Sequence, residues 1–263
     1  MKSKTIRKIK MDKRKISALC KASLWGACIL LFPIFSGVLS AVLSLETTET
    51  LFFQGIFMLF SLAVPLIFVL SGKWSWEEIG FRKYDVDCSK KAYHFLPLTV
   101  IFIPVAMQGF SCKSTIYVFG NLFLYLTVGI AEEIYFRGII PRYLRKEFST
   151  KGVILFSTII FGTGHIAAAF TAGNGWEVFL TMLNAFLFGW LAIEMVLISK
   201  NIMPVMLLHF FFDFETKIVV MNGTALLSAE CVRGVIVFVA AVWLAAVIRI
   251  NLNFQQPKRG RNT

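Results

Sequence analysis

Ionisable side chains interrupt three strongly apolar stretches of this sequence. The run YVFGNLFLYLTVGIAEEIYFRG carries two adjacent carboxylates, Glu132 and Glu133, followed by the guanidinium group of Arg137. A second stretch ends in FGTGH, and a third contains HFFFD. The candidate reactive residues are Glu132, Glu133, His165, His209 and Asp213. Because a charged group at membrane depth is costly, such groups usually face the interior of a helix bundle and mark a function.

A cluster of these residues could activate water in two ways. Glu132 could act as a general base, because a desolvated carboxylate is a better base near neutral pH. His165 would then orient the same water, and His209 with Asp213 would stabilise the oxyanion. Alternatively, Glu132, His165 and His209 could hold a zinc ion whose fourth position is left for water. The sequence contains no HExxH motif, so it does not require a metal.

A structural role is the competing interpretation. Glu133 lies four residues before Arg137, so the two can pair on one helix face and anchor the helix end. This pairing leaves Glu132 alone, because neighbouring helical residues point about 100° apart. In a predicted helix over 115–137, both carboxylates would lie roughly 6–8 Å from the cytoplasmic end.

Three polar residues of another apolar stretch are interpreted as structural. Glu177 and Glu194 lie near opposite ends of one predicted helix, from which long side chains can reach the membrane interface. Asn184 can form a hydrogen bond to a neighbouring helix, beside the small residues Ala185 and Gly189. No catalytic role is expected for these residues.

Membrane-spanning helices must position the reactive residues. Hydrophobic residues make up 57% of the 263 residues, charged residues make up 16%, and the mean hydropathy is +0.72. This composition excludes an ordinary soluble domain. A bilayer core requires about 20 apolar residues per helix. Suitable segments are 22–44, 50–71, 94–111, 115–137, 153–170, 176–198, 202–222 and 233–250. We therefore predict an all-α, polytopic transmembrane helix bundle of about eight helices.

The positive charge is distributed unevenly between the two sides of this bundle. One side carries 24 of the 27 Lys and Arg residues, and the other carries only Lys113, Lys217 and Arg233. Because Lys and Arg accumulate in cytoplasmic loops, both termini are expected in the cytoplasm. The net charge of +12 then reflects topology, with the lipid bilayer and not nucleic acid as the expected partner. The expected location is the plasma membrane.

The polar residues resemble the motifs of the CPBP intramembrane protease family, which processes CAAX proteins and bacteriocins and is also called Abi. The matching residues are Glu132, Glu133 and Arg137 for Glu-Glu-x-x-x-Arg, Phe161 and His165 for Phe-x-x-x-His, and His209 and Asp213 for His-x-x-x-Asn/Asp. WEEIGFRK, residues 76–83, also resembles a stretch upstream of the core of this family, with Phe81 in place of leucine. The resemblance covers about 74–215.

The resemblance implies an intramembrane endopeptidase, similar to CAAX prenyl endopeptidases, with a cavity open toward the cytoplasmic side. It would hydrolyse membrane-associated, lipid-anchored or short hydrophobic peptides, by a glutamate mechanism or as a metalloendopeptidase. The implied roles are general base for Glu132, positioning of water for His165, the oxyanion site for His209 and Asp213, and support for Glu133, Arg137 and Phe161.

One residue departs from part of the family. Eukaryotic CAAX-cleaving members place Asn where this chain has Asp213. An amide can donate a hydrogen bond to an oxyanion, whereas an ionised aspartate cannot. Asp213 must therefore be protonated, orient His209 or help to hold a metal.

The predicted organisation has four parts. Residues 1–21 form a basic cytoplasmic segment, 22–72 form two N-terminal transmembrane helices, 73–222 form the protease-like core, and 223–263 form the last helix and a basic cytoplasmic tail. Two other functions remain open for the same residues. An ion- or proton-coupled transporter could use these polar residues to relay charge. A non-catalytic protein of the bacteriocin-immunity type could contain the same residues without using them for catalysis.

Overall fold

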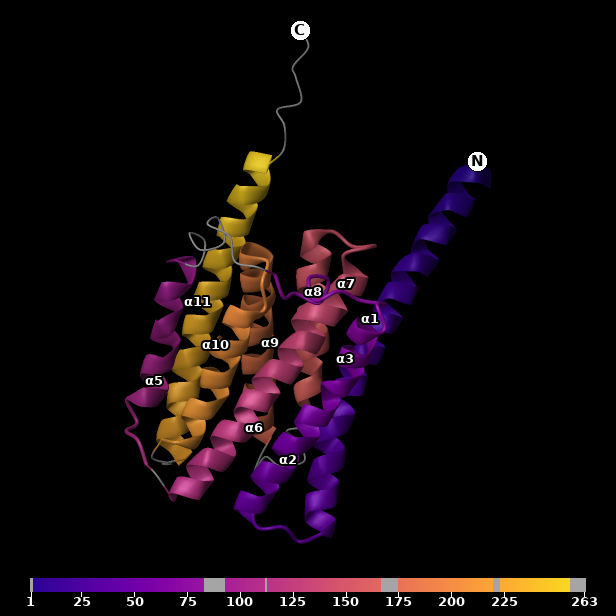
Figure 1. Cartoon of the computed structure of the whole chain (residues 1–263). Coiled ribbons are helices and arrows are strands. Elements are labelled where there is room, and N and C mark those ends of the chain that lie inside the picture. Colours follow the sequence, from indigo (N-terminus) through magenta and orange to yellow (C-terminus); the bar gives the residue numbers. More distant parts are fainter. Residues whose placement is uncertain (1, 83–92, 112, 167–174, 220–222, 256–263) are drawn as a thin grey trace.

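A computed structural model of the chain describes all residues except 1, 83–92, 112, 167–174, 220–222 and 256–263 (Figure 1). The described residues form a bundle of helices that run roughly parallel and antiparallel to one another (Figure 1). Five of the described helices are long and apolar enough to cross a membrane, and two shorter apolar helices accompany them. The predicted all-α membrane bundle is confirmed, and the chain is an integral membrane protein.

The N-terminal part is a helical hairpin. Helix α1 spans Lys2–Val42, so it begins far before residue 22, the predicted start of the first span. Helices α2, Thr47–Ser61, and α3, Ala63–Leu70, follow each other almost without a break. The hairpin is joined to the centre of the bundle, because the hydroxyl of Tyr135 donates a hydrogen bond of 2.8 Å to the carbonyl oxygen of Ser61.

The fourth predicted span is longer than the sequence indicated. Helix α6, Thr115–Glu133, continues through a π-helical segment, η2, Ile134–Ile139, into α7, Ile140–Leu144. Pro141 has no N–H group, so it cannot continue the regular α-helical hydrogen bonding at this point. Because the helix continues past Arg137, Glu132 lies roughly 15–20 Å from its end. The predicted depth of 6–8 Å was therefore wrong, and the carboxylates lie nearer the middle of the bundle.

The remaining helices surround this element. They are η1, Tyr93–Phe102, and α5, Ile103–Ala106, then α8, Thr150–Gly164, α9, Gly175–Ser199, α10, Met203–Phe214, and α11, Gly223–Gln255. The beginning of α1 and the far end of α11 lie at the same end of the bundle (Figure 1). The last helix starts ten residues before the predicted boundary at 233, so Arg233 lies inside α11 and not in a loop.

A short connection packs tightly on the π-helical segment. Gly80 has a φ of +99°, which L-residues rarely adopt, and its carbonyl oxygen accepts a hydrogen bond of 3.0 Å from the backbone N–H of Ile202. A β-carbon at Gly138 would lie only 2.3 Å from the carbonyl oxygen of Ile79. The connection can therefore reach the helix only because position 138 has no side chain.

The close approach at Gly138 can be tested by substitution. We expect Gly138→Ala to destabilise the protein by about 1–3 kcal/mol, because the new methyl group meets rigid backbone. The control is Gly37→Ala in α1, where the nearest atom would be a flexible Gln54 side chain at 3.9 Å. That change removes a helix-interior glycine and should stabilise the protein slightly. Equal thermal unfolding temperatures for the two variants would contradict the packing described here.

Candidate active site

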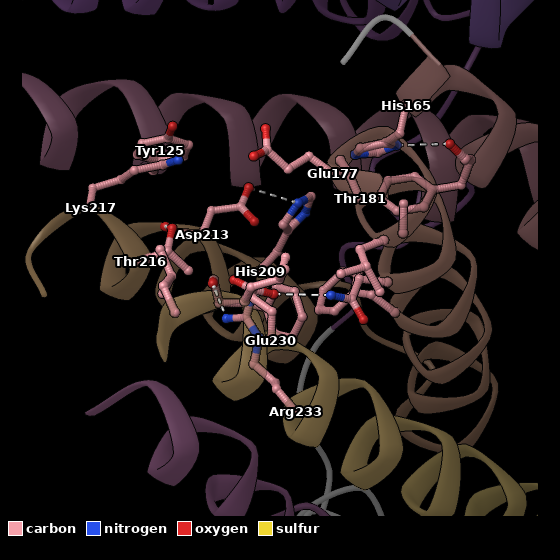
Figure 2. Close-up of a pocket in the computed structure, with 18 residues that line it drawn as sticks. Tyr125, His165, Glu177, Thr181, His209, Asp213, Thr216, Lys217, Glu230 and Arg233 are labelled. Carbon is pink, nitrogen blue, oxygen red and sulfur yellow. Dashed lines mark hydrogen bonds and ion pairs between the residues drawn. The ribbon is translucent and has the colours of Figure 1, made fainter. Parts of the chain in front are cut away.

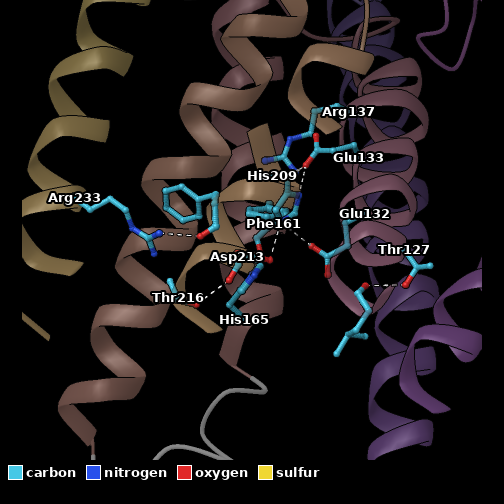
Figure 3. Close-up of polar contacts among 12 residues, drawn as sticks. Thr127, Glu132, Glu133, Arg137, Phe161, His165, His209, Asp213, Thr216 and Arg233 are labelled. Carbon is cyan, nitrogen blue, oxygen red and sulfur yellow. Dashed lines mark hydrogen bonds and ion pairs between the residues drawn. The ribbon is translucent and has the colours of Figure 1, made fainter. Parts of the chain in front are cut away.

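The two adjacent carboxylates stand at the last residues of α6 and face different surroundings (Figure 3). The side chain of Glu133 is 0% exposed, whereas that of Glu132 is 14% exposed. Their divergence follows from the turn of about 100° between neighbouring helical residues. Each carboxylate therefore has its own set of partners.

Glu133 forms a buried ion pair with Arg137. Nη1 of Arg137 donates a hydrogen bond of 2.9 Å to Oε1 of Glu133, one helical turn away, as the sequence spacing indicated. The guanidinium carbon of Arg137 lies 4.0 Å from the centre of the Phe161 ring, in a cation–π contact. The ring of Phe161, on α8, thus stabilises the cation of an ion pair that belongs to another helix.

His209 links the carboxylates of two helices. Its Nδ1 lies 2.7 Å from Oε1 of Glu133, a hydrogen-bonding distance between α10 and α6. Its Nε2 lies 3.4 Å from Oδ2 of Asp213 and 3.9 Å from Oε2 of Glu132. The ring of Phe188 covers the imidazole, with ring centres 4.8 Å apart. Three acidic groups therefore surround one histidine that is almost wholly buried.

His165 joins the group from the end of α8. It caps this helix, and its Nδ1 lies 3.0 Å from the carbonyl oxygen of Phe161. Because a carbonyl oxygen only accepts hydrogen bonds, Nδ1 must carry the proton of the neutral ring, which leaves Nε2 as an acceptor. His165 is close enough to Glu132 and Asp213 for electrostatic interaction.

A cavity of about 640 Å³ adjoins these residues (Figure 2). Its lining includes His165, His209 and Asp213, together with aromatic and aliphatic side chains of α9, α10 and α11. Glu132 is not among the lining residues, but its Oε2 lies 3.9 Å from Nε2 of His209, which does line the cavity. The volume lies within the range of about 300–1,000 Å³ that is usual for ligand pockets. The site thus combines convergent polar groups with space for a substrate.

The sequence interpretation missed a second polar network on the opposite wall of the cavity. Arg233 of α11 donates hydrogen bonds to the carbonyl oxygen of Phe212, at 2.8 Å, and to Glu215, at 2.9 Å. Its Nη2 also contacts both carboxylate oxygens of Glu230, at 2.7 Å. Arg233 is 3% exposed and lies well inside α11, whereas the sequence placed it at the first residue of the predicted span 233–250. The signal was present in the sequence, because Glu230 and Arg233 are spaced to pair within one helix.

The three polar residues of α9 have the following surroundings. Asn184 donates a hydrogen bond of 3.0 Å to Glu230 of α11, so the expected bond to a neighbouring helix is present. Glu194 is 1% exposed and accepts a hydrogen bond of 2.7 Å from Trp190. The side chain therefore does not extend to the membrane interface as expected; its Oε1 bonds within the helix, and its Oε2 is buried without a hydrogen-bond partner among the described residues. Glu177 lines the large cavity.

The zinc hypothesis gains no support from the arrangement of possible ligands. In the part of the chain that the structure describes, no group of three or more His, Cys, Asp or Glu side chains is placed to hold a metal ion. The Nδ1 of His209 is engaged by Glu133, and the Nδ1 of His165 by a carbonyl oxygen, so only the Nε2 atoms of the two rings are left as possible metal ligands. Zinc binding by Glu132, His165 and His209 remains a prediction for experiment.

Comparison with known proteins gives one match. Residues 114–214 match the family model described as type II CAAX prenyl endopeptidase Rce1-like. This segment contains all the motif residues and lies inside the predicted core of 73–222, so the family prediction is confirmed for it. No curated protein and no solved structure matches the chain.

The buried pair of Glu133 and Arg137 can be tested by a double-mutant cycle. We expect Arg137→Met to lower the free energy of unfolding by about 3–5 kcal/mol, because it leaves Glu133 buried without its cationic partner. Glu133→Leu should also destabilise the protein. The double variant should lose clearly less than the sum, since it leaves neither charge alone.

A surface pair provides the control for this cycle. Arg142 lies 3.3 Å from Glu78, whose side chain is 49% exposed. Arg142→Met should cost no more than about 1 kcal/mol, because solvent screens exposed ion pairs. Strictly additive losses at Glu133 and Arg137 in denaturant titrations would contradict the coupling.

Proposed function

From the match of residues 114–214 to the Rce1-like type II CAAX prenyl endopeptidases, we propose that the chain is an intramembrane endopeptidase. It hydrolyses peptide bonds of membrane-associated or hydrophobic peptides that enter the cavity of about 640 Å³. The single observation that carries the proposal is the position of His209. This residue lies within 4 Å of Glu132, Glu133 and Asp213, and it also lines the cavity.

Glu132 is the proposed general base. Its Oε2 is buried and has no hydrogen-bond partner among the described residues, so it is available to accept a proton from water. Glu133 also has an unpartnered Oε2, but its side chain is 0% exposed and its Oε1 already accepts bonds from Arg137 and His209, whereas the side chain of Glu132 is 14% exposed. The division of roles between the adjacent carboxylates follows from this difference. A base must be within hydrogen-bond reach of the proton that it removes.

His165 is the proposed second contact of the attacking water. With Nδ1 bonded to the carbonyl oxygen of Phe161, the unprotonated Nε2 can accept the other water proton as a hydrogen bond. Water held between Glu132 and His165 is then oriented toward a peptide carbonyl in the cavity. Holding the reactants in this geometry lowers the entropic part of the barrier.

His209 is the proposed oxyanion donor. In its doubly protonated form, Nδ1–H donates to Glu133 and Nε2–H faces Glu132 and Asp213. In this proposal Asp213 stabilises and orients the imidazolium group and does not itself donate to the oxyanion, a role that suits an aspartate in place of an asparagine. A cationic N–H at the oxyanion stabilises the negative charge that develops on the carbonyl oxygen.

The proposed reaction balances without an additional reactant. Glu132 removes a proton from water as the water oxygen bonds to the peptide carbon, and the carbonyl oxygen becomes an oxyanion near His209. When the tetrahedral intermediate collapses, the carbon–nitrogen bond breaks. Glu132 returns its proton to the departing amine, so the carboxylate is regenerated.

Arg233 is a proposed positioning residue. Its bond to the carbonyl oxygen of Phe212 fixes the residue next to Asp213, and the Phe212 ring lies 3.8 Å from its guanidinium carbon. The network that includes Glu215 and Glu230 thereby holds α10 against α11. Arg233 lies outside the segment that matches the family.

The proposed orientation places both termini in the cytoplasm, where most of the Lys and Arg residues would lie. In this orientation the cavity residues Glu177, Lys217 and Leu226 lie toward the end of the bundle opposite the termini, so the opening toward the cytoplasmic side that the resemblance implies does not follow from it. The proposed location is the plasma membrane. These assignments rest on the charge distribution and on the description of the matching family.

The proposal predicts a specific loss of cleavage in Glu132→Gln. We expect kcat to fall by about 10²–10⁴-fold, because glutamine cannot accept the proton of water. The assay uses a quenched fluorescent CAAX peptide in farnesylated and unprenylated forms, with cleavage sites determined by mass spectrometry. Glu194→Gln is the matched control, because it neutralises another buried membrane carboxylate that bonds only to Trp190 in the described structure. Undiminished cleavage by Glu132→Gln would refute the assignment of the base.

Metal dependence provides a separate test. The glutamate mechanism predicts that purified protein keeps its cleavage rate after dialysis against a chelator, with less than one equivalent of zinc by elemental analysis. Loss of activity that returns with added zinc would favour the alternative in which Glu132, His165 and His209 hold the metal. In that outcome, His165→Ala should also lower the bound zinc.

A further inference from the structure

A second cavity, of about 250 Å³, lies at the end of the bundle where α7 and α9 end. The connection at 77–82 forms one wall, and the end of α9 forms another. The beginning of α1 and the end of α11 lie at the same end of the bundle (Figure 1). This cavity is separate from the one lined by His165, His209 and Asp213, and it has no role in the proposed cleavage.

Four cationic side chains line this small cavity. They are Arg82, Arg137, Arg145 and Lys200. Arg82 and Arg145 are close enough to repel each other. Two carboxylates, Glu77 and Glu78, also line the cavity, but Glu78 is engaged by Arg142 and by the backbone N–H of Ser75. The remaining charge around the cavity is positive.

Arg137 supplies the buried wall of the cavity. Its side chain is 1% exposed, and its Nη1 is bonded to Glu133. Its Nη2 is also buried and has no hydrogen-bond partner among the described residues. An unsatisfied buried donor costs roughly 1–3 kcal/mol, and more when it is charged. The charge of this guanidinium adds to the positive potential of the cavity that Arg137 lines.

Lys200 occupies an unusual backbone position at the rim. Its φ is +55°, in the left-handed region that favours glycine or asparagine after a helix. A lysine in this conformation is uncommon, and the strain is of the order of 1 kcal/mol. Lys200 nevertheless lines the cavity together with Arg82 and Arg145.

We propose that this cavity is a binding site for a phosphate group, contributed by an anionic lipid headgroup or by free phosphate. Guanidinium groups recognise phosphate oxygens with paired hydrogen bonds, and a lysine adds a point charge. The volume is smaller than that of pockets for drug-sized ligands, which start at about 300 Å³. A compact tetrahedral anion fits these dimensions and pairs with the cations of the rim.

The site shares Arg137 with the carboxylate pair of the large cavity. One nitrogen of this guanidinium holds Glu133, and Glu133 in turn holds His209. A phosphate bound at Arg137 is therefore two contacts away from the imidazole. Binding itself does not depend on the proposed cleavage, so it is measured on the full-length protein without a peptide substrate.

Thermal unfolding measures the binding directly. Protein in uncharged detergent is titrated with inorganic phosphate, with chloride replaced to keep the ionic strength constant. In parallel, the protein is reconstituted into phosphatidylcholine vesicles with and without phosphatidylglycerol. We expect at least one of the two anions to raise Tm by a few degrees, because a ligand that binds only the folded state stabilises it. A response to phosphatidylglycerol alone identifies the lipid headgroup, and a response to inorganic phosphate identifies the free anion.

Matched variants decide whether the response comes from this cavity. Arg145→Gln and Lys200→Asn should abolish the shift, and asparagine at 200 tolerates the left-handed backbone. Lys146→Gln is the control, because it removes an exposed positive charge next to Arg145 without touching the cavity. The absence of any shift with either anion would overturn the proposal. A shift that persists in both cavity variants, or disappears equally in Lys146→Gln, would also overturn it.

Discussion

The hydrogen bond between Glu133 and His209 is the interaction on which the rest of the site depends. It connects α6 with α10 across 76 residues of sequence, at a distance of 2.7 Å. Both side chains are almost completely shielded from solvent. Each therefore needs a hydrogen-bond partner from the protein in place of water. Arg137 completes the arrangement by bonding to the same oxygen of Glu133. A cation, an anion and an imidazole therefore stabilise one another inside an apolar bundle.

The π-helical segment η2 and the packing around it bring Arg137 and Glu133 together. The π-helical segment immediately after Glu133 places Arg137 against the ring of Phe161, and Gly138 allows the connection near Ile79 to pack on the same segment. π-helical segments within α-helices often occur at functional sites. Here the segment separates two cavities that differ in character. The larger one adjoins the histidines, whereas the smaller one is rimmed by cations at the end of the bundle.

Local spacing in the sequence predicted the contacts within one helix well. Glu133 with Arg137, and His209 with Asp213, are four residues apart, and both pairs meet because that spacing places them on one face. Hydropathy likewise predicted the membrane bundle. The contact between Glu133 and His209 was expected only as a general convergence of polar groups, because no local pattern specifies which side chains of two distant helices meet.

The errors have a common physical origin. Hydropathy ends a predicted span at a charged residue, so Arg137 was placed at the end of one predicted helix and Arg233 at the start of another. In the structure both arginines lie inside helices, because carboxylates on the same or a neighbouring helix neutralise them. Ion pairing thus extends helices through residues that would otherwise be excluded from an apolar interior. The small cavity escaped prediction for a related reason, since its cations come from three separate parts of the chain.

The protonation and hydrogen bonding of His209 provide the most direct measurement. The chain has only three histidines, so nitrogen NMR of protein labelled at histidine gives a spectrum that substitution of each ring can assign. The account predicts that Nδ1 of His209 carries a proton held in a strong hydrogen bond. It also predicts that Glu133→Gln shifts this resonance far more than it shifts that of His165. A His209 spectrum that does not respond to Glu133→Gln would contradict the account.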